Sequence, residues 1–154
     1  MKPQILRHPD GTREWSLNGL RVLTTPIEVR ATDTKWGRRR VYELLKPYSV
    51  IMKTREFNLS VDVPAGYQTD FGSVPIIAQV LLGNRDNYLH SFLAHDALCD
   101  QHFPPFIANG VLRMIMLATG VPMWKRLTYY YALQIMGYGS PPRRLWNWFV
   151  GHWK

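Results

Sequence analysis

The middle of the chain carries side chains whose types are suited to acid–base chemistry. His95 and Asp96 are adjacent, and Asn109 follows them beyond the pair Pro104-Pro105. An imidazole is a common general base, and carboxylate or amide oxygens can orient it or bind a cation. Further polar residues precede this pair on a short segment. The sequence therefore predicts one site made of His95, Asp96, Asp70, Asn109 and Ser73, with Thr69 as a binding residue.

Three interpretations of this site stay open. His95, Asp96 and Asp70 would suit zinc or another divalent cation, because nitrogen and oxygen donors are mixed. Alternatively, the residues form a buried polar network that joins a sheet to helices, with Ser73 as a helix N-cap and Asp96 bonded to Thr69 or to backbone amides. A serine triad on Ser73 has little support, since no GxSxG motif is present.

The elements that must position these residues change type at the site. Up to Val63 the chain alternates apolar and polar residues between turn signals such as Asn18-Gly19, which is typical of β-strands. The clearest strand spans residues 57–63. Helices are expected at about 74–82, 84–102, 106–119 and 123–136, the third led by prolines. Pro26 marks an edge or bulge, and residues 33–39 form a polar turn.

These elements predict an α+β fold, in which an N-terminal antiparallel sheet of about five strands packs on a C-terminal bundle of about three helices. Residues 1–139 are expected to form a single domain, and residues 140–154 a cationic aromatic tail. On a helical projection Asp96 shares a face with Leu89, Phe92 and Leu93. We therefore expect Asp96 to point into apolar surroundings and His95 to border them.

Composition and charge indicate which kinds of partner the protein would bind. Apolar residues make up 46% of the chain, and the formal net charge is +8. The positive charge fits either a soluble basic domain or one with an anionic partner. The Arg38, Arg39, Arg40 run is interpreted as a solvated loop, with contact to such a partner as the alternative. No basic stretch matches a nucleic-acid motif, so a nucleic acid is an unlikely partner.

Cysteine content and hydropathy indicate the kind of cellular compartment that suits the protein. Cys99 is the only cysteine, which excludes an internal disulfide and a CxxC zinc site and suits a reducing compartment. We find no signal peptide and no apolar run that could form a transmembrane helix.

The C-terminal tail combines cationic and aromatic residues. It could pack back on the domain, dock into a partner subunit, or lie at a membrane interface, where Trp and Arg are favoured. Its candidate binding residues are Arg143, Arg144, Trp146 and Trp148.

The segment Tyr42 to Gly137 resembles an uncharacterised phage and prophage family of unknown function. The resemblance rests on residues 63–75, which read VPAGYQTDFGSVP, on His95-Asp96, and on Gly120-Val121-Pro122. This sequence has Asn109 where that family commonly has Asp, and Cys99 where it commonly has Tyr. The resemblance implies a phage or prophage origin, among virion morphogenesis or lysis genes, and a location in the virion or the host cytoplasm.

A fainter likeness is to the His-Asp helix of secreted phospholipases A2, whose calcium loop and disulfides are absent here. It implies His95 as a general base, Asp96 as a cation ligand, Asn109 as the residue that orients His95, and Asp70 as a further ligand.

Two functions follow as hypotheses. The first is a virion component of a phage tail or tail tip, whose partners are other phage proteins such as tail subunits. The aromatic content, the cationic tail and Asn109 in place of Asp favour it. The alternative is a phage-encoded hydrolase with a His/Asp site that a divalent cation would serve, phospholipase-like or concerned with lysis.

Overall fold

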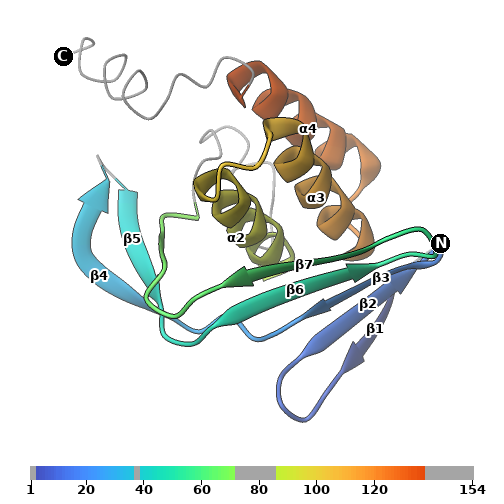
Figure 1. Ribbon diagram of the computed structural model, residues 1–154, viewed down its shortest axis with the longest axis horizontal. Coiled ribbons are helices and arrows are strands. Elements are labelled where there is room, and N and C mark those ends of the chain that lie inside the picture. The colour runs from blue at the N-terminus through green and yellow to red at the C-terminus, as the bar shows by residue number, and fades with distance from the viewer. Residues whose placement is uncertain (1–2, 37–38, 72–85, 138–154) are drawn as a thin grey trace.

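The computed structural model describes residues 3–36, 39–71 and 86–137 and shows an α+β protein (Figure 1). Strands fill the N-terminal half and helices the C-terminal half, as predicted. The eight strands of the described residues form two antiparallel sheets instead of one. The larger sheet has the order β1-β2-β3-β6-β7, with β1 Gln4–Arg7, β2 Arg13–Leu17, β3 Leu20–Thr24, β6 Tyr48–Lys53 and β7 Asn58–Val63. The smaller has the order β4-β5-β8, with β4 Val29–Trp36, β5 Arg39–Leu44 and β8 Gln68–Thr69.

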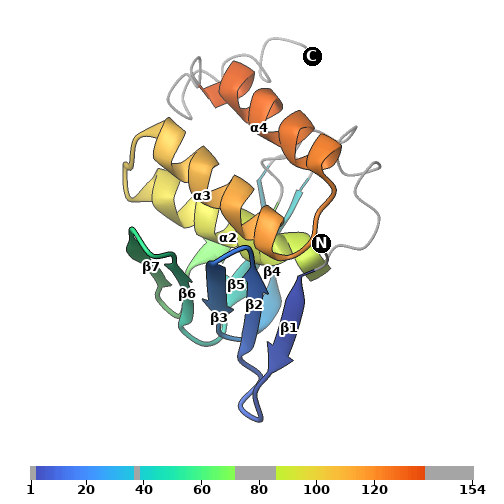
Figure 2. The ribbon, with the colours of Figure 1, turned by 90° about the vertical axis from the view of Figure 1, so that its right-hand side faces the viewer.

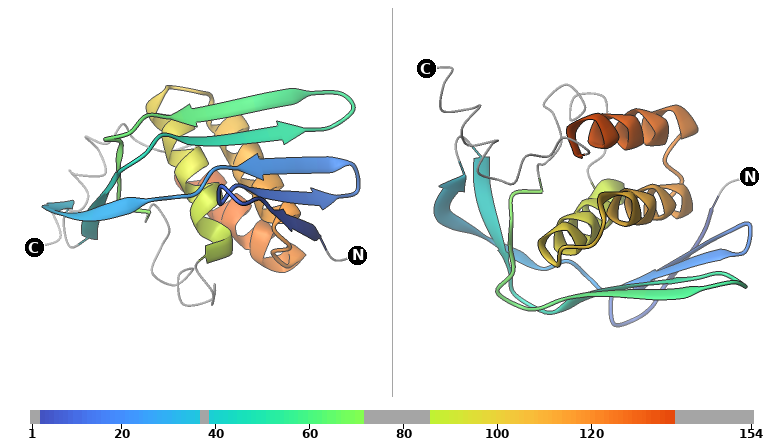
Figure 3. Two further views of the ribbon diagram at one scale, coloured as in Figure 1. Left: turned by 90° about the horizontal axis from the view of Figure 1, so that it is seen from below. Right: turned by 45° about the horizontal axis from the view of Figure 1, so that its top comes forward.

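The second sheet begins beyond Pro26, which the sequence marked as an edge or bulge. The chain leaves the larger sheet after Thr24 and passes through Pro26, which has no N–H to give to a strand ladder. It then pairs again as β4 with β5, and this hairpin lies at one end of the larger sheet (Figures 1 and 3). Residues 33–36 therefore belong to a strand, not to the predicted polar turn.

The helices form two further layers. Helices α2 (Asp86–Asp100) and α3 (Pro105–Ala118) lie on one face of the larger sheet, and α4 (Met123–Gly137) lies on their far side (Figures 1 and 2). Pro105 occupies the first turn of α3, as expected, because the missing N–H would be unpaired there in any case. The order of layers is thus sheet, helix pair, single helix.

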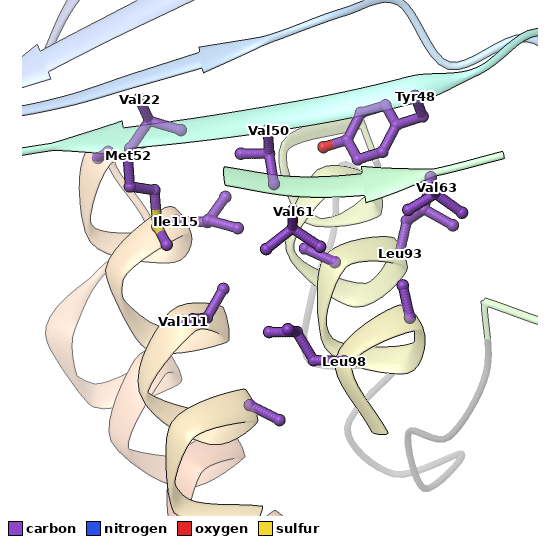
Figure 4. Close-up of a cluster of buried hydrophobic side chains, with 14 of the residues drawn as sticks. Val22, Tyr48, Val50, Met52, Val61, Val63, Leu93, Leu98, Val111 and Ile115 are labelled. Carbon is purple, nitrogen blue, oxygen red and sulfur yellow. The ribbon is translucent and has the colours of Figure 1, made fainter. Parts of the chain in front are cut away.

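Two apolar cores hold these layers together. The first lies between the larger sheet and the helix pair (Figure 4). Its labelled members come from the sheet (Val22, Tyr48, Val50, Met52, Val61, Val63), from α2 (Leu93, Leu98) and from α3 (Val111, Ile115). The second joins the helix pair to α4 through Tyr88, Phe92, Leu112, Met116, Val121, Tyr129 and Leu133. Helix α3 contributes to both cores.

Several predictions concern residues outside the described ranges. They are the short helix at 74–82, Ser73, Arg38 and the tail with Arg143, Arg144, Trp146 and Trp148. The domain boundary at 139 stays a prediction for the same reason. Among the described helices, none is both long and apolar enough to cross a membrane.

Candidate buried histidine site

Strand β8 brings the loop residues onto α2. Thr69 pairs with Tyr42 of β5 and is buried. Its hydroxyl donates a hydrogen bond to Asp96 Oδ2 at 3.1 Å and accepts one from the Phe71 N–H at 3.0 Å. One turn further along α2, the Tyr67 hydroxyl donates to Asp100 Oδ2 at 2.7 Å. These hydrogen bonds attach the segment after β7 to α2. The bond between Thr69 and Asp96 is the one that the buried-network interpretation predicted.

The short turn between α2 and α3 brings Asn109 to His95. The two helices run antiparallel, and His95 Nε2 lies 2.9 Å from Asn109 Oδ1 (the helix pair is seen in Figure 3). Both side chains are deeply buried, with 7% and 2% of their surfaces exposed. Because the amide oxygen can only accept, this orientation gives His95 Nε2 the proton. The predicted proximity of these two residues is confirmed, and their function stays a prediction.

The other ring nitrogen faces a carboxylate. His95 Nδ1 lies 3.6 Å from Asp96 Oδ1. Burial of the ring lowers the pKa of His95, but the Asp96 carboxylate and the Cys99 side chain raise it more, and the resulting pKa is about 10. His95 is therefore an imidazolium at neutral pH, with an oxygen acceptor near each N–H.

The relative burial of His95 and Asp96 is the reverse of the prediction. Every residue from His90 to Leu98 is buried except Asp96, which is half-buried. The helical projection assumed one apolar face. Helix α2 instead lies between the sheet on one side and α3 and α4 on others, so nearly all of its faces are covered.

Cys99 is a member of this site that the sequence analysis did not select. Its side chain is exposed, and its Sγ lies 3.9 Å from His95 Nδ1 and 3.8 Å from Nε2. The spacing of four residues on one helix places two side chains on the same face, so the signal was present in the sequence.

A second buried histidine, His90, was also missed. Its Nδ1 lies 3.2 Å from the Tyr48 hydroxyl, and its ring stacks on Tyr48 and meets the edge of Trp15. Burial, with a smaller contribution from nearby Arg13, lowers the pKa of His90 to about 4. His90 is therefore neutral at pH 7, while His95 on the same helix is charged.

The predicted metal set is not assembled. Asp70 follows Thr69 and is half-buried. Within the described ranges, no group of three His, Cys, Asp or Glu side chains is placed to hold a metal ion, and His95, Asp96 and Asp70 all belong to these ranges. His95 Nε2 is bonded to Asn109, which is not a member of the set, and Nδ1 faces Asp96, which is a member.

Two residues of the arginine run, Arg39 and Arg40, belong to β5 and not to a loop, and Arg38 lies outside the described residues. Arg39 pairs with Trp36 and Arg40 with Lys35 in the strand register, and Arg40 is exposed. The strand register does not test contact with an anionic partner, so that contact stays a prediction.

The protein is thus a small α+β protein in which a buried histidine of one helix binds an asparagine of the next, beside a β-sheet. The chain belongs to the family described as Protein of unknown function (DUF1353), whose model matches residues 42–133. The matched segment begins in β5 and ends in α4, so it contains the whole cluster around His95. Searches of curated proteins and of solved structures gave no significant match.

Proposed function

We propose that this protein is a virion-associated component encoded by a phage or prophage, acting in the tail or at its tip. The observation that carries the proposal is a set of large apolar side chains exposed on α4, the outermost layer. Met123, Trp124 and Tyr131 are 65%, 55% and 59% exposed. Exposed aromatic and Met side chains are typical of protein–protein interfaces, so the partners would be other phage proteins, such as tail subunits.

The cluster around His95 supports a structural role. Thr69, Asp96, His95 and Asn109 form a chain of contacts from β8 through α2 to α3. A charged ring whose two N–H groups face acceptors inside the protein is suited to holding elements together. It is poorly suited to act as a general base, because it already carries the proton.

Charge and signature support the remaining parts of this proposal. The net charge of +8 would favour an acidic partner surface, and the C-terminal tail offers a further contact to a subunit or to a membrane interface. The motif at residues 63–75 supports the phage origin. The protein would then reside in the virion or, before assembly, in the host cytoplasm.

A phage-encoded hydrolase is the second candidate. The observation that favours it is the 2.9 Å contact between His95 and Asn109, since a catalytic histidine needs an orienting partner. With His95 as base and Asp96 and Asp70 holding a cation, activity would disappear in His95→Ala and on removal of divalent cations. The high pKa of His95 speaks against this form of the mechanism.

Purified particles test the main proposal. Mass spectrometry of gradient-purified virions from a phage or lysogen that carries the gene should detect the protein. The double variant Met123→Ser/Trp124→Ser should be lost from particles at least tenfold relative to wild type while its melting temperature is unchanged. Phe57→Ser, at an exposed aromatic residue beside β7, is the matched control. Absence of the wild-type protein from particles would refute the proposal.

A further inference from the structure

Cys99, His95 and Asn109 lie together near the turn between α2 and α3. The thiol is exposed, the imidazole beneath it is buried, and the amide binds the ring from α3. The three therefore run from solvent into the protein as thiol, imidazole and amide. The contacts among them do not depend on the metal set that the sequence predicted.

The Cys99 sulfur lies in contact with the His95 ring. The sulfur lies 3.8 and 3.9 Å from the two ring nitrogens, and Asn109 Oδ1 lies 2.9 Å from Nε2. Asn109 thus holds the ring through Nε2, and the Asp96 carboxylate lies 3.6 Å from Nδ1. A thiol beside a positively charged imidazole is a nucleophile, and exposure makes it accessible.

A second observation points to a ligand. Asn109 Nδ2 is buried and has no hydrogen-bond partner within the described part of the chain. A buried donor without a partner is costly, and the oxygen of a bound molecule would satisfy it. This donor belongs to the same amide whose oxygen binds His95.

We propose that Cys99 is a nucleophile for acyl transfer, with His95 as its proton carrier and Asn109 as a positioning residue that holds the ring. The combination of thiol, imidazole and asparagine amide is one of the arrangements that unrelated folds use for nucleophilic catalysis. The proposal goes beyond the virion role and does not need it, since a virion component can also carry an active thiol.

The reaction balances with water as the only co-reactant. Cys99 attacks the carbonyl carbon of an ester or thioester as its thiolate, and the His95 imidazolium balances the negative charge. A sulfur–carbon bond forms, the bond to the leaving group breaks, and the leaving group takes a proton from His95. Water then cleaves the thioester on Cys99: the neutral His95 ring takes one proton of the water, the carboxylic acid is released, and the thiolate and the imidazolium are restored.

The surroundings select the acyl group by charge. Asp96 and Asp100 flank Cys99 in the sequence of α2, and Asp96 is within 3.6 Å of the ring. These carboxylates would repel an anionic substrate. The expected substrates are therefore neutral or cationic acyl esters and thioesters.

The single cysteine makes the test direct, because every thiol adduct reports on Cys99. The full chain is treated at pH 7 with iodoacetamide and, separately, with the neutral ester p-nitrophenyl acetate, and intact mass is followed. Relative to glutathione, we expect alkylation at least about tenfold faster and formation of an acetyl adduct that decays by hydrolysis. Cys99→Ser should abolish both.

Variants decide whether the ring and the amide are responsible. His95→Gln should lower both rates at least tenfold, whereas the exposed control His102→Gln should not change them. Asn109→Ala should lower them, and Asn109→Asp, which keeps an acceptor for Nε2, should restore them. Each variant is compared at equal folded fraction by circular dichroism, and if His95→Gln does not fold, the Asn109 pair decides. Alkylation no faster than glutathione, rates unaffected by these changes, or fast alkylation without an acetyl adduct would each overturn the proposal.

Discussion

The His95 ring is enclosed by groups that favour its protonated form. Asn109 accepts at Nε2, Asp96 faces Nδ1, and the Cys99 sulfur lies beside the ring. His90, five positions earlier, has the opposite environment, because burial, with a smaller contribution from Arg13, lowers its pKa. Two buried histidines on one helix therefore carry different charges, and each couples folding to pH in its own direction.

The summed contribution of His95 and His90 to the free energy of unfolding should be largest near pH 6.5. The pKa of His95 is raised to about 10, so its contribution is full below pH 6.5 and is lost as the pH rises toward 10. The pKa of His90 is lowered to about 4, so its contribution is full above pH 6.5 and is lost as the pH falls toward 4. Urea denaturation across this range measures both effects.

Variants assign the two limbs of this profile. His95→Gln should remove much of the loss of stability between pH 6.5 and 10 and leave the acid side unchanged, whereas His90→Gln should act only on the acid side. The exposed His102→Gln should change neither. An alkaline limb that persists in full in His95→Gln would show that another group is responsible.

Helix α2 ends in a backbone motif that most sequences build with glycine. His102 has φ of 61°, its N–H donates to Cys99 O at 3.1 Å, and the Phe103 N–H donates to Leu98 O at 3.0 Å. This is a Schellman motif, and at the end of α3 the same position is held by Gly120 with φ of 80°. A side chain in this left-handed conformation is strained, so His102 costs α2 some stability.

Replacing His102 with glycine should therefore stabilise the protein. We expect His102→Gly to raise the free energy of unfolding by roughly 0.5–1 kcal/mol, because relief of strain exceeds the added entropy of the unfolded chain. Chemical denaturation measures it, with His102→Ala as the control that keeps a Cβ and should gain nothing comparable. A loss of stability in His102→Gly would mean that the His102 side chain makes a contact of value.

Local sequence patterns predicted where most strands and helices lie, but not which other elements pack against them. The Asn18-Gly19 turn, the alternation before Val63 and the prolines before α3 act through neighbours in sequence, so their elements were predicted within a few residues. The burial of His95 depends on the sheet, on α3 and on α4 together, and no periodicity within α2 reports that. The proximity of Asn109 was predictable because a short connection forces antiparallel neighbours.

Helix α3 couples the three layers into one structure. Ile115 belongs to the core against the sheet, and the adjacent Met116 belongs to the core against α4. Both are fully buried. The division into two sheets was not predictable, since Pro26 signals an interruption but not where the strand pairs next. The layer order likewise depends on contacts between residues far apart in sequence.

Truncation in either core should destabilise the whole molecule. Ile115→Ala and Met116→Ala should each lower the free energy of unfolding by roughly 2–5 kcal/mol. Arg113 lies on the same helix but is exposed, so Arg113→Ala should lower the free energy of unfolding by less than about 1 kcal/mol. Because α3 serves both cores, a single transition by circular dichroism and by Trp fluorescence is expected for each variant. Separate transitions in Met116→Ala would show that α4 unfolds independently.

The central claim is that His95 is a buried imidazolium held by Asn109 and Asp96, and ring nitrogen NMR tests it most directly. Uniformly ¹⁵N-labelled protein, with His95 assigned by comparison with His95→Gln, is titrated across the neutral range. We predict that both His95 ring nitrogens stay protonated from pH 5 to beyond pH 8, consistent with a pKa of about 10. A His95 ring that loses its proton with a midpoint near 6.5 would contradict the claim, and with it the structural role proposed for the cluster.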